Sequence, residues 1–225
     1  MPNLSTLQPL HVSVVDQLYA ALRVAIIDNV LTPGARISEA EVAQQYGISR
    51  QPAREAFIKL ANEGLLEIRP QRGSFVAKIS LSDVMDARFV REAVEADIVK
   101  LLGAGTDPAV IADLRGQIGR QKHLIGGSAR DFMEADELFH RTLAEAAGKA
   151  KAWQVVVAMK AQMDRVRFLS SMHFPVDRLI AQHTEIVDGI EGGDPARADR
   201  GMRLHLQGIL TDLPVIKQEH PEYFK

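Results

Sequence analysis

Helical periodicity with no strand alternation is the feature of this chain that most constrains its fold. From Ser82 onward, apolar residues recur three and four positions apart in six stretches, which are separated by short breaks rich in glycine and proline. We expect helices at about 82–103, 107–125, 128–147, 150–172, 176–191 and 195–212. Because the links are short, neighbouring helices should run antiparallel, which predicts an all-α bundle of six to seven helices within a domain of residues 79–225.

The first third of the chain follows a different pattern. An amphipathic helix is expected from Val14 to Asn29, and "SEAEVAQQYG" and "ISRQPAREAFIKLANEGLL" predict two further helices joined by a tight turn at Gly47. The next stretch, "LLEIRPQRGSFVAKI", has the pattern of two strands around a basic turn. Together these elements predict a winged helix-turn-helix domain over residues 1–78, with a small β-hairpin as the wing. The fold as a whole is therefore expected to be mainly α.

Basic residues lie where such a domain would contact DNA. Arg50 and Arg54 stand one turn apart near the start of the second helix of the helix-turn-helix, and more arginines occupy the hairpin tip. A glycine at that tip lets the backbone approach a phosphate or a groove edge. We expect a DNA-contact surface made of Arg50, Gln51, Arg54, Arg69, Arg72 and Gly73. The alternative is that the arginines are ordinary solvated surface charges.

Composition narrows the class of protein but does not by itself indicate DNA binding. The net charge is −2, and residues 1–78 hold 8 Lys and Arg against 7 Asp and Glu, so the prediction rests on where the arginines lie. The absence of cysteine excludes disulfides, thiolate metal sites and cysteine nucleophiles. No apolar run approaches the roughly 20 residues that cross a bilayer, and the N-terminus lacks the pattern of a signal peptide. We expect a cytoplasmic protein with no membrane partner.

Polar residues interrupt the apolar faces of three predicted helices. Asp136 and His140 lie one turn apart on one such face, and His183 and His205 interrupt two others. An unpaired charge in the interior costs several kcal/mol, so these groups need partners. Imidazole nitrogen and carboxylate oxygen suit a divalent ion, with zinc as the first choice and nickel, manganese or iron as alternatives. Otherwise each histidine is a core residue satisfied by one hydrogen bond. The other histidines are expected at the surface or in turns: His11, His123, His173 and His220.

Arg91 interrupts the apolar face of the helix expected at 82–103. A guanidinium that points inward needs an anion, and its planar fork suits a carboxylate. That anion is either an internal partner, such as Glu95 or Asp136, or an acidic effector molecule. Arg165 and Arg167 are weaker candidates for contacts in the same pocket.

Two parts of the sequence resemble known families. The strings "SRQPAREAF", "EGLL" and "RGSFV" are similar to the winged-helix domain of GntR-type bacterial transcription regulators. The strings "REAVE", "DELFH", "AQHTEIVDGIEGGD", "MRLHL" and "HPEYF" resemble the FCD domain, the effector-binding half of the FadR subgroup. The resemblance implies that Arg50 and Arg54 enter the major groove and that Gly73 reaches toward the minor groove. The chain departs from the family pattern at Gln51, where threonine is usual, and at Ala40, where arginine is frequent.

The resemblance also implies a sensing site. Residues matching Asp136, His140, His183 and His205 bind one divalent ion in metal-dependent FCD proteins, and the arginine matching Arg91 contacts an acidic effector.

We therefore expect a homodimeric, non-enzymatic transcription regulator, a repressor rather than an activator, that binds an inverted repeat in double-stranded DNA and senses a small organic acid. One alternative is a metal-dependent hydrolase that uses the aspartate and the three histidines, although no obvious general base accompanies them. Another is a regulator that senses the metal ion itself.

Overall fold

The computed structural model describes residues 13–225, which form two compact units. The first unit ends at Ile79 and also includes Glu222–Lys225, and the second comprises Ser80–Pro221. Residues 1–12, which contain His11 and the segment that lacks a signal-peptide pattern, lie outside the described residues.

The last residues of the chain belong with the first unit, whereas the sequence pattern assigned them to the second domain. The Ile79 N–H donates to the Tyr223 carbonyl at 2.8 Å, and the Lys225 N–H donates to the Ile79 carbonyl at 3.1 Å. Ile79 and Phe224 thereby form an isolated parallel β-bridge, and both side chains are buried. A single bridge between residues so far apart in sequence leaves no periodic signal, so the sequence did not reveal it.

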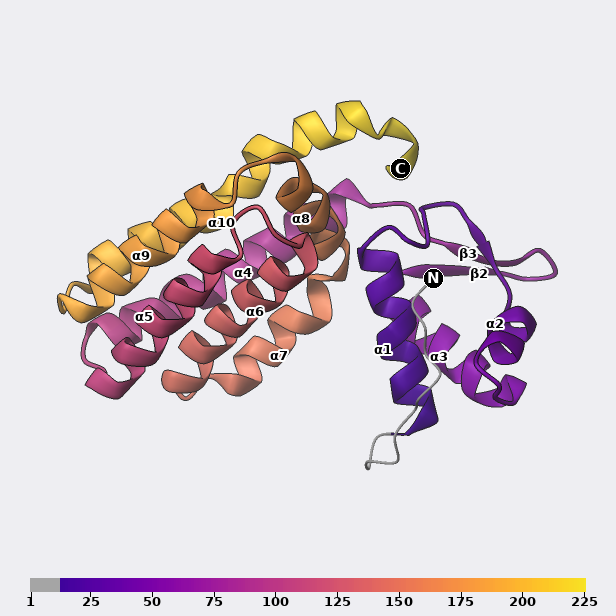
Figure 1. The fold of residues 1–225 in the computed structure, drawn as a ribbon, viewed down its shortest axis with the longest axis horizontal. Helices are drawn as coiled ribbons and strands as arrows, with labels where there is room; N and C mark the ends of the chain where they lie inside the picture. The colour runs from indigo at the N-terminus through magenta and orange to yellow at the C-terminus, as the bar shows by residue number, and fades with distance from the viewer. Residues whose placement is uncertain (1–12) are drawn as a thin grey trace. The chain divides into compact units, whose positions relative to one another are not determined.

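The first unit is a winged helix-turn-helix, as predicted (Figure 1). Its elements are α1 (Val14–Ile27), β1 (Arg36–Ile37), α2 (Glu39–Gln45), α3 (Arg50–Asn62), β2 (Leu66–Arg69) and β3 (Gly73–Val76). The three strands form an antiparallel sheet in the order β1-β3-β2. β1 was not expected, because two residues are too few to show strand alternation. Leu22 of α1 and Phe57 and Leu60 of α3 are among the buried side chains that hold the unit together.

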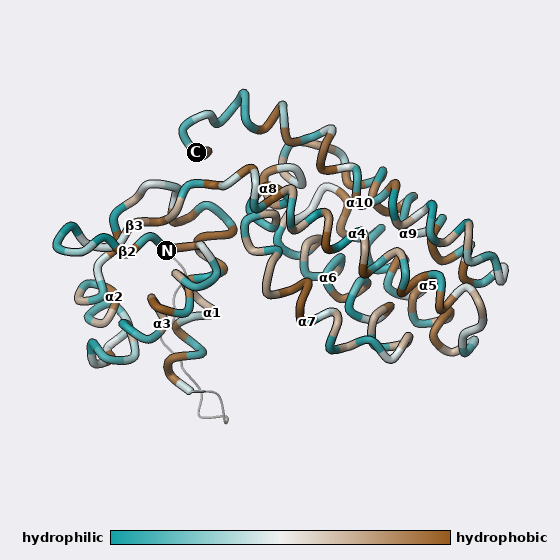
Figure 2. The backbone as a smooth tube through the Cα atoms, turned by 180° about the vertical axis from the view of Figure 1, so that it is seen from behind, coloured by the Kyte–Doolittle hydropathy of each residue, from teal (hydrophilic) through white to brown (hydrophobic). Residues whose placement is uncertain are grey.

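The β2–β3 hairpin is the predicted wing. Arg69 and Gly73 are the last paired residues, and the tip between them is hydrophilic (Figure 2). Gly73 has φ of 97°, in the left-handed region where a side chain is strained. A Cβ atom there would also lie 3.2 Å from Arg36 Nε. Glycine thus lets the backbone turn at the tip while Arg36 of the neighbouring strand lies against it.

The second unit is the predicted all-α bundle. Its helices are α4 (Leu81–Gly103), α5 (Pro108–His123), α6 (Ala129–Ala146), α7 (Ala150–Met159), α8 (Ala161–His173), α9 (Asp177–Glu191) and α10 (Pro195–Glu219), followed by the short 3₁₀ helix η1 (Pro221–Tyr223), which runs into the first unit. Phe139, Leu143 and Ile186 are among the fully buried side chains of its core.

Two boundaries in this unit differ from the sequence prediction. The helix expected at 150–172 is interrupted at Lys160, whose buried ammonium lies 2.7 Å from Asp164 and 2.8 Å from Glu137 of α6. The helix expected to end at 212 continues through Pro214 to Glu219, and Ile216 beyond the proline is buried. A proline removes only one backbone donor, and burial of apolar side chains beyond it helps the helix to continue.

Helices α9 and α10 lie side by side in close contact (Figure 1). Gly189 makes this possible, because a Cβ atom at this position would lie 2.6 Å from the backbone nitrogen of Ala198. The close approach brings the inward faces of the two helices together, and these faces carry His183 and His205. No helix within residues 13–225 combines the length and the apolar character needed to cross a membrane.

Candidate metal centre and nucleic-acid interface

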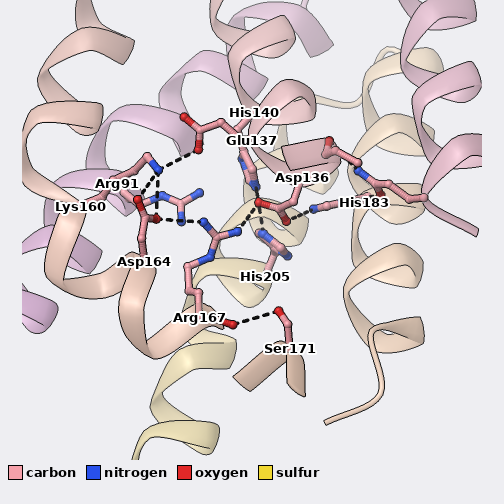
Figure 3. A network of polar contacts seen from close by, with 12 residues as sticks. Arg91, Asp136, Glu137, His140, Lys160, Asp164, Arg167, Ser171, His183 and His205 are labelled. Carbon is pink, nitrogen blue, oxygen red and sulfur yellow. Dashed lines mark hydrogen bonds and ion pairs between the residues drawn. The ribbon is translucent and has the colours of Figure 1, made fainter. Parts of the chain in front are cut away.

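The structure brings together the four residues that the sequence singled out as metal ligands. Asp136 and His140 come from α6, His183 from α9 and His205 from α10, and all four are buried (Figure 3). One ligand atom of each lies within 4.8 Å of those of the other three. Three helices therefore direct donor atoms toward one point in the interior.

Each imidazole has a polar neighbour at its Nδ1 atom. His183 Nδ1 lies 2.8 Å from Gln121 Oε1, and His205 Nδ1 lies 3.2 Å from Gln182 Oε1. His140 Nδ1 lies 2.5 Å from Glu95 Oε2, a short polar contact that is off the ideal hydrogen-bond direction. A neutral imidazole carries one N–H, so a proton on Nδ1 leaves a lone pair on Nε2.

The Gln121 side chain determines which nitrogen of His183 carries the proton. The Gln121 amide nitrogen donates to the Ala135 carbonyl at 3.2 Å, so the amide oxygen must face His183. His183 Nδ1 is therefore the donor of that pair, and His183 Nε2 can only accept.

The Nε2 atoms and the Asp136 carboxylate face one another, and with every Nδ1 protonated all of them would be acceptors. His140 Nε2 lies 3.1 Å from His205 Nε2, and His183 Nε2 lies 3.5 Å from Asp136 Oδ1. Within residues 13–225, neither His183 Nε2 nor Asp136 Oδ1 has a hydrogen-bond donor. Buried lone pairs that face each other are unfavourable unless a cation lies among them. Metal–ligand bonds of about 2.0–2.1 Å place tetrahedral ligand atoms about 3.3 Å apart, so the donor set fits a divalent ion.

The protonation states of His183, His205 and Asp136 are those that metal ligands need. Burial lowers the pKa of His183 to about 3 and that of His205 well below its ordinary value. Burial alone would raise the pKa of Asp136, but the positive charge of Arg167 holds it well below the usual range. Neutral imidazoles and an ionised carboxylate bind a divalent ion without first releasing a proton.

Arginines surround the cluster. Arg167 contacts Asp136 directly, and its other nitrogen lies 3.4 Å from Asp164 Oδ1 (Figure 3). Arg91 is buried, and its Nε donates to Glu95 Oε1 at 2.6 Å. The internal ion pair that we considered for Arg91 is therefore formed, while contact between Arg91 and an effector stays a prediction. Arg91 and His140 hold the pKa of Glu95 at about 2, although burial alone would raise it.

A small cavity of about 40 Å³ lies beside the cluster. Arg91, Arg167, Arg178 and His205 contribute to its lining. The volume accommodates about three water molecules, and hence a carboxylate group more readily than a whole metabolite. Arg178 is also bound to Asp212 at 2.9 Å, so each of the three arginines at the cavity has an internal anion.

Sequence reasoning did not identify the residues that orient the imidazoles. Gln121 could have been found, because it follows Leu114 and Ile118 on the buried face of α5, where an amide is unexpected. Gln182 is half-buried beside His183 and gives no such signal. Glu95 was considered only as a partner of Arg91.

The predicted DNA-contact residues lie on α3 and the wing of the first unit. Arg50 begins α3, Arg54 follows one turn later, and both are exposed. Within residues 13–225, Arg50, Arg54 and Arg72 have no acidic partner, so their guanidinium groups are available to phosphate or base edges. Gln51 instead donates to Glu55 at 2.9 Å.

Some of the predicted DNA-contact residues line a groove of the first unit. It is lined by Arg36, Arg50, Arg69 and Gly73, among others, whereas Gln51, Arg54 and Arg72 lie outside the lining. Arg69 is held by Glu67 at 2.8 Å and lies over the ring of Phe75. Sequence reasoning missed Arg36, because the strand that presents it was not foreseen.

Comparison with known proteins agrees with this division. The gntR family of bacterial regulatory proteins matches residues 14–76, and the FCD domain matches residues 86–208. The HTH-type transcriptional repressor RspR of Escherichia coli K12 is 36% identical over 224 residues, 99% of this chain and 96% of its own. A regulator from an unstable DNA locus of Streptomyces ambofaciens is 40% identical over 211 residues, 92% of this chain and 88% of its own.

The fold agrees as well. The solved structure of E. coli McbR/YncC superposes with a TM-score of 0.74 at 16% identity and covers 93% of this chain and 99% of its own. The chain thus belongs to the GntR family of bacterial transcription regulators, with an N-terminal winged helix-turn-helix and a C-terminal FCD domain.

Proposed function

We propose that this protein is a homodimeric repressor of the bacterial cytoplasm, whose affinity for an inverted-repeat operator is controlled by a small organic acid bound beside a divalent metal ion. A repressing role is supported by the name of the E. coli relative, which matches nearly the whole chain. Two winged helices related by two-fold symmetry would read two half-sites of double-stranded DNA. Large apolar side chains are exposed on α4 and α10, including Phe89 and Leu204, and would be available to a second copy.

The observation that carries the proposal is the convergence of four buried ligand atoms, two of which, Asp136 Oδ1 and His183 Nε2, have no hydrogen-bond donor within residues 13–225. Asp136, His140, His183 and His205 would hold the ion, with zinc as the first choice. When bound, the ion would supply a Lewis-acidic centre at which a carboxylate could complete the coordination.

The neighbouring arginines would bind the same acid. Arg91, Arg167 and Arg178 line the cavity, and guanidinium groups bind carboxylates through two parallel hydrogen bonds. Because these arginines already have internal anions, a bound acid would redistribute their ion pairs, such as the pair between Arg167 and Asp136. If the new ion pairs form more favourably in one arrangement of the protein than in another, the acid shifts the balance toward that arrangement.

The experiment measures DNA affinity with and without metal and acid. Double-stranded DNA selected from a random library by the full-length protein serves as the operator, and affinity is measured by fluorescence anisotropy. Metal-loaded protein is titrated with formate, acetate, malonate, succinate and citrate. We expect at least one acid to change operator affinity tenfold or more, and no acid to do so after chelation.

Three results would count against the proposal. If an acid changes the operator affinity of metal-loaded and chelated protein equally, the metal ion is not needed for acid sensing. DNA affinity that follows the metal alone would favour metal sensing. Failure of the selection to yield any preferred DNA would remove the operator-binding function.

A further inference from the structure

A second cluster of metal-ligand side chains lies away from the buried site. It consists of His173, the last residue of α8, and of Glu219 and His220 at the end of α10. One ligand atom of each lies within 4.8 Å of the other two. No pattern in the sequence connects these residues, and both histidines were expected at the surface or in turns.

The geometry of the cluster suits a shared ligand. His173 Nε2 lies 3.1 Å from Glu219 Oε2. The rings of His173 and His220 are stacked with an interplanar angle of 9° and centroids 5.8 Å apart. Two imidazoles and a carboxylate thus present three donor atoms on the same side of two packed helices.

The electrostatic setting favours a cation. His173 ends α8, and His220 caps the C-terminus of α10, so the cluster lies at the negative ends of two helix dipoles. Glu219 adds a formal negative charge. His173 and Glu219 are partly exposed, with side-chain accessibilities of 33% and 48%, so water can fill the remaining coordination positions.

We propose that His173, Glu219 and His220 form a second, surface site for a divalent transition-metal ion of the zinc type. Two imidazole nitrogens, one carboxylate oxygen and water form a donor set that zinc accepts. The three ligand atoms already lie within 4.8 Å of one another, and bonds of about 2.0–2.2 Å would draw them together around the ion. An ion in this site cross-links the last turns of α8 and α10. The inference does not depend on the buried centre or on its proposed role.

The test counts bound ions in the full-length chain. Protein freed of metal with a chelator is dialysed to equilibrium against Zn²⁺, and metal per chain is measured by elemental analysis. The wild type is compared with the double variant His173→Ala/His220→Ala. The matched control is His123→Ala, which removes the exposed last residue of α5.

We expect the double variant to bind one ion fewer per chain than the wild type, and His123→Ala to bind the same number. The buried centre contributes equally to all three proteins, so the difference reports the surface site alone. If the double variant and the wild type bind equal numbers, His173 and Glu219 form only an ordinary ion pair and the proposal is wrong.

A second variant keeps the proposal testable if the double variant misfolds. Glu219→Gln keeps the size of the side chain and removes its charge. We expect at least a tenfold loss of Zn²⁺ affinity at the surface site, and unchanged affinity would overturn the role of the carboxylate. Circular dichroism confirms in each case that the helices are retained.

Discussion

Replacing Gln121 with leucine tests whether the imidazoles are pre-oriented for a metal ion. The Gln121 side chain accepts a hydrogen bond from His183 Nδ1 at 2.8 Å, and its own amide is fixed by the Ala135 carbonyl at 3.2 Å. Leucine has a similar volume but cannot accept a hydrogen bond. The buried Nδ1–H would lose its partner, at a cost of about 1–3 kcal/mol.

In the metal-free variant, His183 can avoid this cost if its proton moves from Nδ1 to Nε2. With the proton on Nε2, His183 would donate toward Asp136 Oδ1, which lies 3.5 Å away and has no other donor within residues 13–225. The metal would then have to displace a proton and break that contact. We therefore expect Gln121→Leu to weaken metal affinity about 10–100-fold, or roughly 1.4–2.7 kcal/mol.

The assay is competition for Zn²⁺ against a chelator of known affinity, with full-length protein. Gln117→Leu is the matched control, because Gln117 is also a buried amide on α5, but it donates to Asp113 and Thr142 and contacts none of the four ligands. Its affinity for Zn²⁺ should equal that of the wild type. The reasoning is refuted if Gln121→Leu binds Zn²⁺ as tightly as the wild type, or if Gln117→Leu loses as much.

Three further predictions concern DNA, stability and pH. Arg54→Ala should lose about 1–3 kcal/mol of operator binding in an anisotropy assay if Arg54 reads a guanine. Arg120 is exposed on α5, and Arg120→Ala should lose no operator binding. Equal losses in the two variants would contradict the assignment of Arg54 to the DNA-contact surface. Arg91→Met should destabilise the protein by about 3–5 kcal/mol in urea unfolding, because the buried Glu95 carboxylate would lose its guanidinium partner and keep only the contact with His140. An unchanged midpoint would show that the pair is not needed. Chelated protein should lose stability as the pH falls from 6.5 toward 5. The pKa of His183 is about 3 in the folded state and 6.5 ordinarily, so only the unfolded chain takes up the proton in this range. The free energy of unfolding should fall by about 1.4 kcal/mol per pH unit for one group, and a flat urea midpoint over this range would contradict the prediction.

Much of the fold could be predicted from the sequence because long amphipathic helices carry a strong periodic signal. The four buried donors were visible for the same reason, since Asp136 and His140 interrupt an apolar stripe and leave a polar group to be explained. The structure adds that these side chains meet, which sequence alone could not show.

The features that sequence reasoning missed depend on contacts between distant residues. The interruption at Lys160 coincides with an ion pair to Glu137 of another helix, which local periodicity does not encode. Arg36 lies against Gly73 only because a two-residue strand pairs with the wing. Gln182 orients His205 from a half-buried position that looks like ordinary helix surface.

The most direct test of the central claim is an anomalous-difference map from crystals of protein prepared without chelator or affinity metal, recorded at the absorption edge of the metal found by elemental analysis. We predict a single peak among Asp136, His140, His183 and His205, about 2.0–2.1 Å from the three Nε2 atoms. A map with no peak there, and with the four side chains turned toward separate hydrogen-bond partners, would contradict the account.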